Sequence, residues 1–97
     1  MGPHPAGERL IMPLKVSLVS ADAEVWTGEA KLVVTTTTEG QIGFMAGHEP
    51  VLGLLGDGPV RITKTDGSVV EATAADGFVS VESDRVTIVA GHAAIAS

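Results

Sequence analysis

The chain has no cysteine, no tyrosine, one tryptophan and two phenylalanines among its 97 residues. Without cysteine it can form neither a disulfide framework nor a thiolate nucleophile, and it cannot offer a cysteine-ligated zinc or iron site. With so few aromatic side chains it has no stacking platform for sugars or single-stranded nucleic acid. Stability must therefore come from aliphatic packing, for which 44% hydrophobic residues are ample material.

Basic side chains are also scarce. Six Lys and Arg residues stand against twelve Asp and Glu residues, which gives a formal net charge of −6. A protein that binds nucleic acid or an anionic membrane surface needs a basic patch, so neither is the expected primary partner. No apolar run approaches the roughly 18 to 20 residues of a membrane-spanning helix.

The apolar residues that are present recur with period two or in short β-branched runs from Leu14 onward. No segment carries the apolar stripe of an amphipathic helix longer than two turns. The pattern predicts an all-β domain, a sandwich or barrel, with about nine short strands. These are expected at 14–19, 24–27, 29–37, 41–45, 51–55, 61–65, 68–73, 78–81 and 86–89.

Glycine and aspartate punctuate the expected strands. Gly28 is interpreted as a bend and Asp76-Gly77 as a break, and Asp66-Gly67 is expected to form a hairpin turn of type I′, with positive φ at both central residues. Three parts of the chain are predicted: a disordered tail over 1–13, which lacks the features of a secretory signal, a single domain over 14–91, and a frayed end over 92–97.

Residues that could carry chemistry are few. The three histidines, His4, His48 and His92, are scattered along the chain, so no metal site is expected. His48 lies in a loop with Gly47 and Pro50, where it could act as a base, but a histidine that hydrogen-bonds the loop backbone is the favoured interpretation. No nucleophile elbow, paired catalytic acids or phosphate-binding loop is present, so we expect no catalytic residue and no cofactor. Residue by residue, the sequence indicates a binding or structural module in which Trp26 packs in the core or at an edge.

A longer pattern is more specific. Four segments follow one another with characteristic spacing, and three more segments follow downstream. They are VSLVSA at 16–21, VWTGEA at 25–30, TEGQIG at 38–43 and GHEPVL at 47–52, then GPVRI at 58–62, GFVSV at 77–81 and VTIVA at 86–90. Together they resemble the amino-terminal domain of the epsilon subunit of bacterial F-type ATP synthase. The resemblance implies a flattened β-sandwich of about nine to ten strands.

The resemblance also implies a function. Family members are non-catalytic central-stalk (rotor) subunits that link the gamma subunit to the membrane c-ring and couple proton flow to ATP synthesis, at the cytoplasmic face of the bacterial plasma membrane. By resemblance, Glu39, Gly40 and Gln41 face the c-ring together with the nearby His48 loop, and Ser20, His48 and Gly53 face gamma.

The sequence departs from the family pattern in two ways. Ala46 stands where the family usually has proline. The family's carboxy-terminal helical domain, which carries its inhibitory extension and, in some members, an ATP-binding site, has no counterpart here, so no small-molecule ligand is expected. Whether the chain is a naturally short epsilon or part of a longer one is open.

Two further alternatives are open at this point. The domain could be a free-standing ligand-binding or adhesion module with Trp26, His48 and Glu49 lining its site. That function needs a concave polar pocket, whereas a rotor subunit needs an apolar face that is exposed in the isolated domain. Glu39 could form a charge-assisted hydrogen bond to an arginine of the c-ring loops, or it could be a solvated turn residue.

Overall fold

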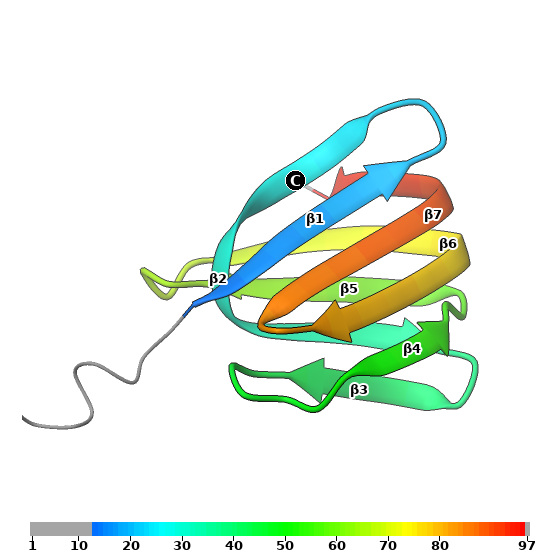
Figure 1. Cartoon of the computed structure of the whole chain (residues 1–97). Helices are drawn as coiled ribbons and strands as arrows, with labels where there is room; N and C mark the ends of the chain where they lie inside the picture. Colours follow the sequence, from blue (N-terminus) through cyan, green and yellow to red (C-terminus); the bar gives the residue numbers. More distant parts are fainter. Residues whose placement is uncertain (1–12, 97) are drawn as a thin grey trace, which may run out of the picture.

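The computed structural model describes residues 13–96, which form seven strands and no helix. The strands are β1 Leu14–Ser20, β2 Glu24–Thr37, β3 Gly40–Phe44, β4 Val51–Leu54, β5 Gly58–Lys64, β6 Val69–Glu82 and β7 Arg85–Ala96 (Figure 1). Neighbouring strands follow the order β1-β7-β6-β5-β2-β3, β4 pairs with β6, and β1 also pairs with β2. The ladder therefore closes on itself, and the predicted all-β fold is confirmed.

The closed ladder is flattened into two layers (Figure 1). The front layer contains β1, β4, the first half of β2, the second half of β6 and the first half of β7. The rear layer contains β3, β5, the second half of β2, the first half of β6 and the second half of β7. The long strands β2, β6 and β7 contribute to both layers, which is how a β-sandwich makes its corners. The predicted sandwich is confirmed.

The expected number of strands was too high, because two presumed breaks lie inside continuous strands. Gly28 pairs with Val16 in the middle of β2, and a Cβ there would lie 2.8 Å from the Trp26 ring, so this glycine makes room for the indole. In β6, Asp76 has φ 63 and a Cβ at Gly77 would collide with the carbonyl oxygen of Val89. These two residues let β6 bend from the rear layer to the front layer instead of ending it.

The predicted frayed end was also wrong where the structure describes it. β7 continues to Ala96, and its second half pairs with the first half of β6, from Ala75↔His92 to Glu71↔Ala96. The small residues of this segment are typical of a loop, but the ladder gives their backbone groups partners. Residues 1–12 of the predicted tail lie outside the described part of the chain.

The hairpin at Asp66-Gly67 is confirmed, but its predicted turn type was wrong. Only Gly67 has positive φ, at 93°. The Lys64 amide donates to Ser68 O at 2.7 Å, and the Gly67 amide donates to Lys64 O at 2.9 Å, as in a three-residue loop that ends in a left-handed glycine. The two-residue turn with both central φ values positive is Ser83-Asp84, at 52° and 60°.

The core lies between the layers and is almost entirely aliphatic. Its largest fully buried side chains include Phe44, Leu14, Leu18, Ile62 and Ile88, which come from both layers. Trp26 is partly buried and packs against this core, so its predicted packing role is confirmed. Burial of each of the large, fully buried core side chains stabilises the fold by about 1.5 to 3 kcal/mol.

Candidate docking face

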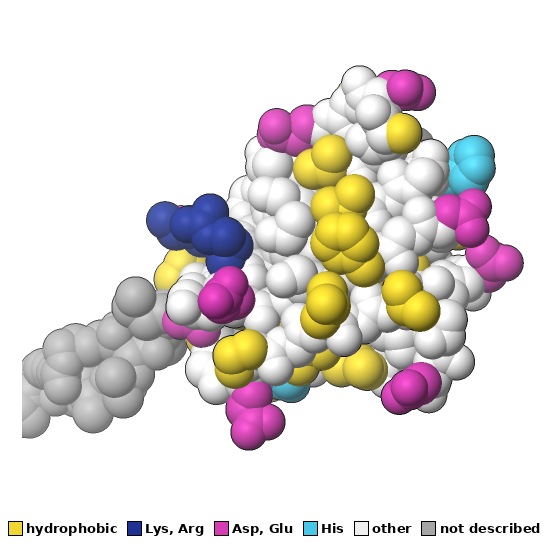
Figure 2. Space-filling model, turned by 45° about the vertical axis from the view of Figure 1, so that its right-hand side comes forward, with side chains coloured by type: hydrophobic (Ala, Val, Ile, Leu, Met, Phe, Trp, Pro, Cys, Tyr) yellow, Lys and Arg dark blue, Asp and Glu magenta, His cyan; other side chains and the backbone are white. Residues whose placement is uncertain are grey.

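The outer surface of the front layer, here called the front face, carries a row of apolar side chains across four strands. The row follows the ladder pairs Val19↔Val89, Val89↔Phe78 and Phe78↔Leu54. Leu54 is 66% exposed and Phe78 39% exposed, and Leu52, two residues along β4, is 76% exposed. Figure 2 shows hydrophobic side chains gathered in a band on this side of the molecule. We call Val19, Val89, Phe78 and Leu54 the apolar row.

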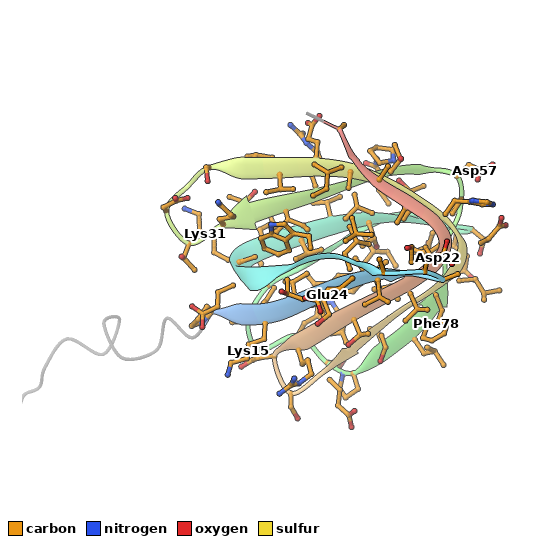
Figure 3. The ribbon with its side chains drawn as sticks, turned by 90° about the horizontal axis from the view of Figure 1, so that it is seen from above. Lys15, Asp22, Glu24, Lys31, Asp57 and Phe78 are labelled. Carbon is orange, nitrogen blue, oxygen red and sulfur yellow. The ribbon has the colours of Figure 1, made fainter. Side chains whose placement is uncertain are left out.

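Polarity increases along the strands away from the apolar row. The next row contains Ser17, Thr87 and Ser80, with Leu52 at its end, and the row after that contains Lys15, Arg85 and Glu82. In Figure 3 Phe78 and Lys15 lie at opposite ends of the front layer. The front face is therefore apolar at one end and charged at the other.

Ser20 and Gly53, two of the residues expected to face gamma, border the apolar row. Ser20 follows Val19 at the end of β1, and its hydroxyl donates to Ala23 O at 3.2 Å. Gly53 lies between the two exposed leucines of β4, where a Cβ would point inward to Val79 and Thr37 at 3.7 and 3.8 Å.

His48, the third residue expected to face gamma, lies in the loop between β3 and β4. Its amide donates to Met45 O at 3.1 Å, and Nδ1 is 2.8 Å from Glu49 O. The ring packs edge-on against Phe44, with 5.1 Å between ring centroids. The favoured interpretation, a histidine that hydrogen-bonds its own loop, is thus confirmed. Residues 13–96 hold no cluster of three or more metal-ligating side chains.

The turn expected to face the c-ring connects β2 to β3. Thr37 Oγ1 donates to Gly40 O at 2.7 Å and accepts from the Glu39 amide at 3.2 Å, while Gly40 has φ 121. The Thr38 amide donates to Leu54 O at 3.1 Å, which places this turn beside one end of the apolar row. The His48 loop lies at the other end of β3, about 13 Å away along the strand.

The residues proposed for a ligand site are not brought together around a hollow. Three of the depressions on the described surface are lined by other residues: one by 50–52 and 80–82, one by 20, 22, 73 and 91–94, and one by 37–39, 42 and 51–54. His48 and Glu49 lie in the loop after β3, whereas Trp26 packs on the core from β2.

The sequence did not single out the exposed apolar residues. In the 51–55 run the residues on both sides of the expected strand are apolar, and most residues of 77–81 are apolar too, so some apolar side chains had to face outward. Apolar residues on both sides of a strand were the available signal for Leu52, Leu54 and Phe78, because an ordinary half-buried strand is polar on its outer side.

Comparison with known proteins establishes the family. A family model described as "ATP synthase, Delta/Epsilon chain, beta-sandwich domain" matches residues 13–96. The chain belongs to this family. The ATP synthase epsilon chain of Streptomyces coelicolor is 51% identical over 77 residues, which cover 79% of this chain and 62% of that relative. The chain thus spans less than two thirds of that protein, and the resemblance seen in the sequence is confirmed.

Solved structures agree on the fold. A chain in the mitochondrial ATP synthase of Euglena gracilis, from an OSCP/F1/c-ring assembly, superposes with a TM-score of 0.82 at 23% identity, over 98% of this chain and 62% of that one. A chain in the central stalk/c-ring of the Tetrahymena thermophila mitochondrial enzyme gives 0.69 at 16% identity, over 84% and 66%. Among the described residues of this family member, no helix is long and apolar enough to cross a membrane.

Proposed function

We propose that this chain is a non-catalytic central-stalk (rotor) subunit of a proton-translocating F-type ATP synthase, where it links the gamma subunit to the c-ring and couples proton flow to ATP synthesis. Family membership and the names of the relatives support the assignment to the enzyme. The likeness to chains of ATP synthase assemblies supports the assignment to the stalk. The position that follows is peripheral, at the cytoplasmic face of the bacterial plasma membrane.

The observation that carries the proposal is the apolar row. Leu54, Phe78 and Leu52 are neighbours across β4 and β6, and each is largely or substantially exposed. A contiguous apolar patch of this kind is typical of a protein interaction site. Its surroundings, with hydroxyl side chains on one side and charges beyond them, match the apolar centre and polar rim of an interface. We assign this face to gamma, with Ser20 and Gly53 at its border and His48 at its far end.

The fold suits the transmission of torque. Five strands, β1, β7, β6, β5 and β2, form a closed hydrogen-bonded ring around one aliphatic core. Three of them run through both layers, so the layers cannot slide past each other without breaking ladder hydrogen bonds. Close-packed protein interiors have low compressibility and transmit strain.

The c-ring contact is assigned to a different part of the chain, the turn Glu39-Gly40-Gln41. This turn is exposed and polar, as expected for contact with polar loops. A charge-assisted hydrogen bond from Glu39 to an arginine of those loops is part of the proposal. If it forms, Glu39→Gln weakens association with an isolated c-ring, and unchanged association contradicts it.

The proposal is tested by recovery of the tagged chain from membranes that contain the ATP synthase. The wild-type chain is expected to carry gamma and c subunits with it. Leu54→Glu places a charge in the apolar row and is expected to abolish recovery of gamma, because the carboxylate would be desolvated without a partner. Val69→Glu is the matched control, since Val69 is an exposed apolar residue (48%) at the start of β6 in the rear layer. Wild-type recovery of gamma by Leu54→Glu would overturn the docking assignment, and recovery of neither subunit by the wild-type chain would overturn the function.

A further inference from the structure

Asp84, in the tight turn between β6 and β7, joins three segments that are far apart in the sequence. Its carboxylate Oδ1 accepts a hydrogen bond from the Gly47 amide at 2.7 Å, across 37 positions of the chain. Its carbonyl oxygen accepts from the Lys15 amide at 2.9 Å. One residue thereby connects the start of β1, the loop of residues 45–50 and the β6–β7 turn.

The bond to Gly47 is the one that ties the 45–50 loop to the rest of the domain. Among the hydrogen bonds of residues 13–96, the other bonds made by this loop stay within it, from the His48 amide to Met45 and between the His48 ring and Glu49. Gly47 has φ 86, and a Cβ there would meet no atom within 4 Å, so the loop is open to solvent around it. Packing alone therefore holds this point of the loop weakly.

The backbone of the turn explains why an aspartate can stand there. Ser83 and Asp84 both adopt left-handed φ, at 52° and 60°, where glycine or asparagine is the usual choice in a two-residue hairpin turn. Aspartate tolerates this conformation better than most residues and adds an ionised acceptor, which makes a stronger hydrogen bond than a neutral one. Ser83 accepts the same backbone conformation, but its side chain makes no hydrogen bond among the described residues.

We propose that Asp84 is the positioning residue of the His48 loop: its carboxylate holds the Gly47 amide, and this contact fixes where the loop places the His48 ring at the charged end of the front face. The effect on the loop stands on the geometry alone. The consequence for the partner rests on the proposed function, in which this face docks to gamma.

The test compares three variants by amide hydrogen exchange in the isolated chain. Asp84→Gly keeps the left-handed backbone and removes the acceptor, Asp84→Asn keeps both, and Ser83→Gly changes the backbone preference at the neighbouring position only. In Asp84→Gly we expect exchange at Gly47 to become about tenfold faster or more, and the His48 ring resonances to lose the shift caused by the ring current of Phe44. The Lys15 amide, which donates to the Asp84 carbonyl in every variant, reports whether the turn itself is intact.

Rescue separates positioning from a merely structural role. Asp84→Asn and Ser83→Gly are expected to keep Gly47 exchange within about threefold of the wild type. Unchanged Gly47 exchange in Asp84→Gly, or an Asp84→Asn variant that behaves like Asp84→Gly, overturns the positioning role.

The same variants are then measured for affinity to purified gamma subunit. Asp84→Gly is expected to bind about three- to tenfold more weakly, because the loop must be ordered on binding, and Asp84→Asn is expected to bind like the wild type. A faster Gly47 amide with wild-type affinity overturns the docking consequence. A wild-type chain that does not bind gamma overturns the proposed function, and the exchange result at Gly47 is independent of that outcome.

Discussion

The two outer faces of the sandwich differ in a way that the core beneath them does not require. On the rear face, Arg61 and Glu71 form an ion pair at 3.0 Å with both side chains more than half exposed, and Thr36 Oγ1 donates to Pro59 O at 3.0 Å. The front face presents the apolar row instead. β6 contributes to both faces, with Glu71 outward in its first half and Phe78 outward in its second. Polar residues on either outer face would be equally compatible with folding. The apolar residues of the front face therefore indicate a partner.

The largest effect is expected where β6 passes from one face to the other. Gly77→Ala forces a Cβ into the Val89 carbonyl oxygen, and neither backbone can move without breaking the β6–β7 ladder. We expect a loss of about 3 kcal/mol or more in the free energy of unfolding, measured by urea denaturation. Gly53→Ala in β4 is the control, because its Cβ would make only ordinary contacts at 3.7 and 3.8 Å. Equal stability of the two variants would contradict the collision expected at Gly77, where β6 bends from one layer to the other.

Removing the difference between the faces should change binding more than stability. The double variant Leu52→Ser, Leu54→Ser is expected to lose about tenfold or more in affinity for gamma, measured by titration, because about 1.4 kcal/mol of apolar burial corresponds to a factor of ten. Its unfolding free energy is expected to fall by only about 1 kcal/mol, since Leu52 and Leu54 are both mostly exposed.

The matched double variant on the rear face is Arg61→Ser, Glu71→Ser. It removes an exposed ion pair, which contributes about 0 to 1 kcal/mol, and it is expected to bind gamma like the wild type. A rear-face variant that loses as much affinity as the front-face variant would remove the distinction between the faces.

A smaller effect is expected inside the rear layer. Thr35 is fully buried on β2, and its hydroxyl has no hydrogen-bond partner among residues 13–96. Thr35→Val replaces that hydroxyl with a methyl group of similar size and is expected to raise the free energy of unfolding by about 1 kcal/mol. In Thr37→Val the same change removes a hydroxyl that is hydrogen-bonded to Gly40 O and should destabilise. Thermal denaturation of both variants gives the comparison, and a destabilised Thr35→Val would show that its hydroxyl is satisfied.

The smallest effect is a pH dependence in the β5–β6 hairpin. Hydrogen bonds from the Ser68 hydroxyl (2.6 Å) and amide (2.9 Å) lower the pKa of Asp66 below its ordinary value of 3.8. Because the folded-state pKa is below the unfolded one, the ionised carboxylate stabilises the fold above the ordinary value, and this contribution is lost as pH falls through the folded-state pKa. The stability difference between the wild type and Asp66→Asn should therefore be present at neutral pH and shrink in acid. A difference that stays constant with pH would contradict the assignment.

Local chemistry explains which features could be predicted from the sequence. Period-two patterning requires strands, and Asp66-Gly67 requires a turn, so the all-β fold and the hairpin were predictable. Gly28 and Gly77 were misinterpreted because glycine serves two needs, a turn or a close approach, and only the tertiary neighbours, the Trp26 ring and the Val89 carbonyl, show which need applies.

The docking face was less predictable for a related reason. Alternation identifies which residues share a side of a strand, but Leu54 and Phe78 become neighbours only when β4 pairs with the second half of β6. The link from Asp84 to Gly47 spans 37 positions, which no local pattern reveals. Ser20, Gly53 and the Glu39 turn came from the family resemblance, and their roles stay predictions.

The most direct test of the central claim is hydroxyl-radical footprinting of the chain alone and bound to gamma, read out by mass spectrometry at the exposed apolar side chains. We expect oxidation of Leu52, Leu54 and Phe78 to fall sharply in the complex, while oxidation of Val69, on the opposite layer, stays at the level of the free chain. Protection of Val69 with Leu54 and Phe78 still oxidised would show that the partner binds the rear face and would contradict the account.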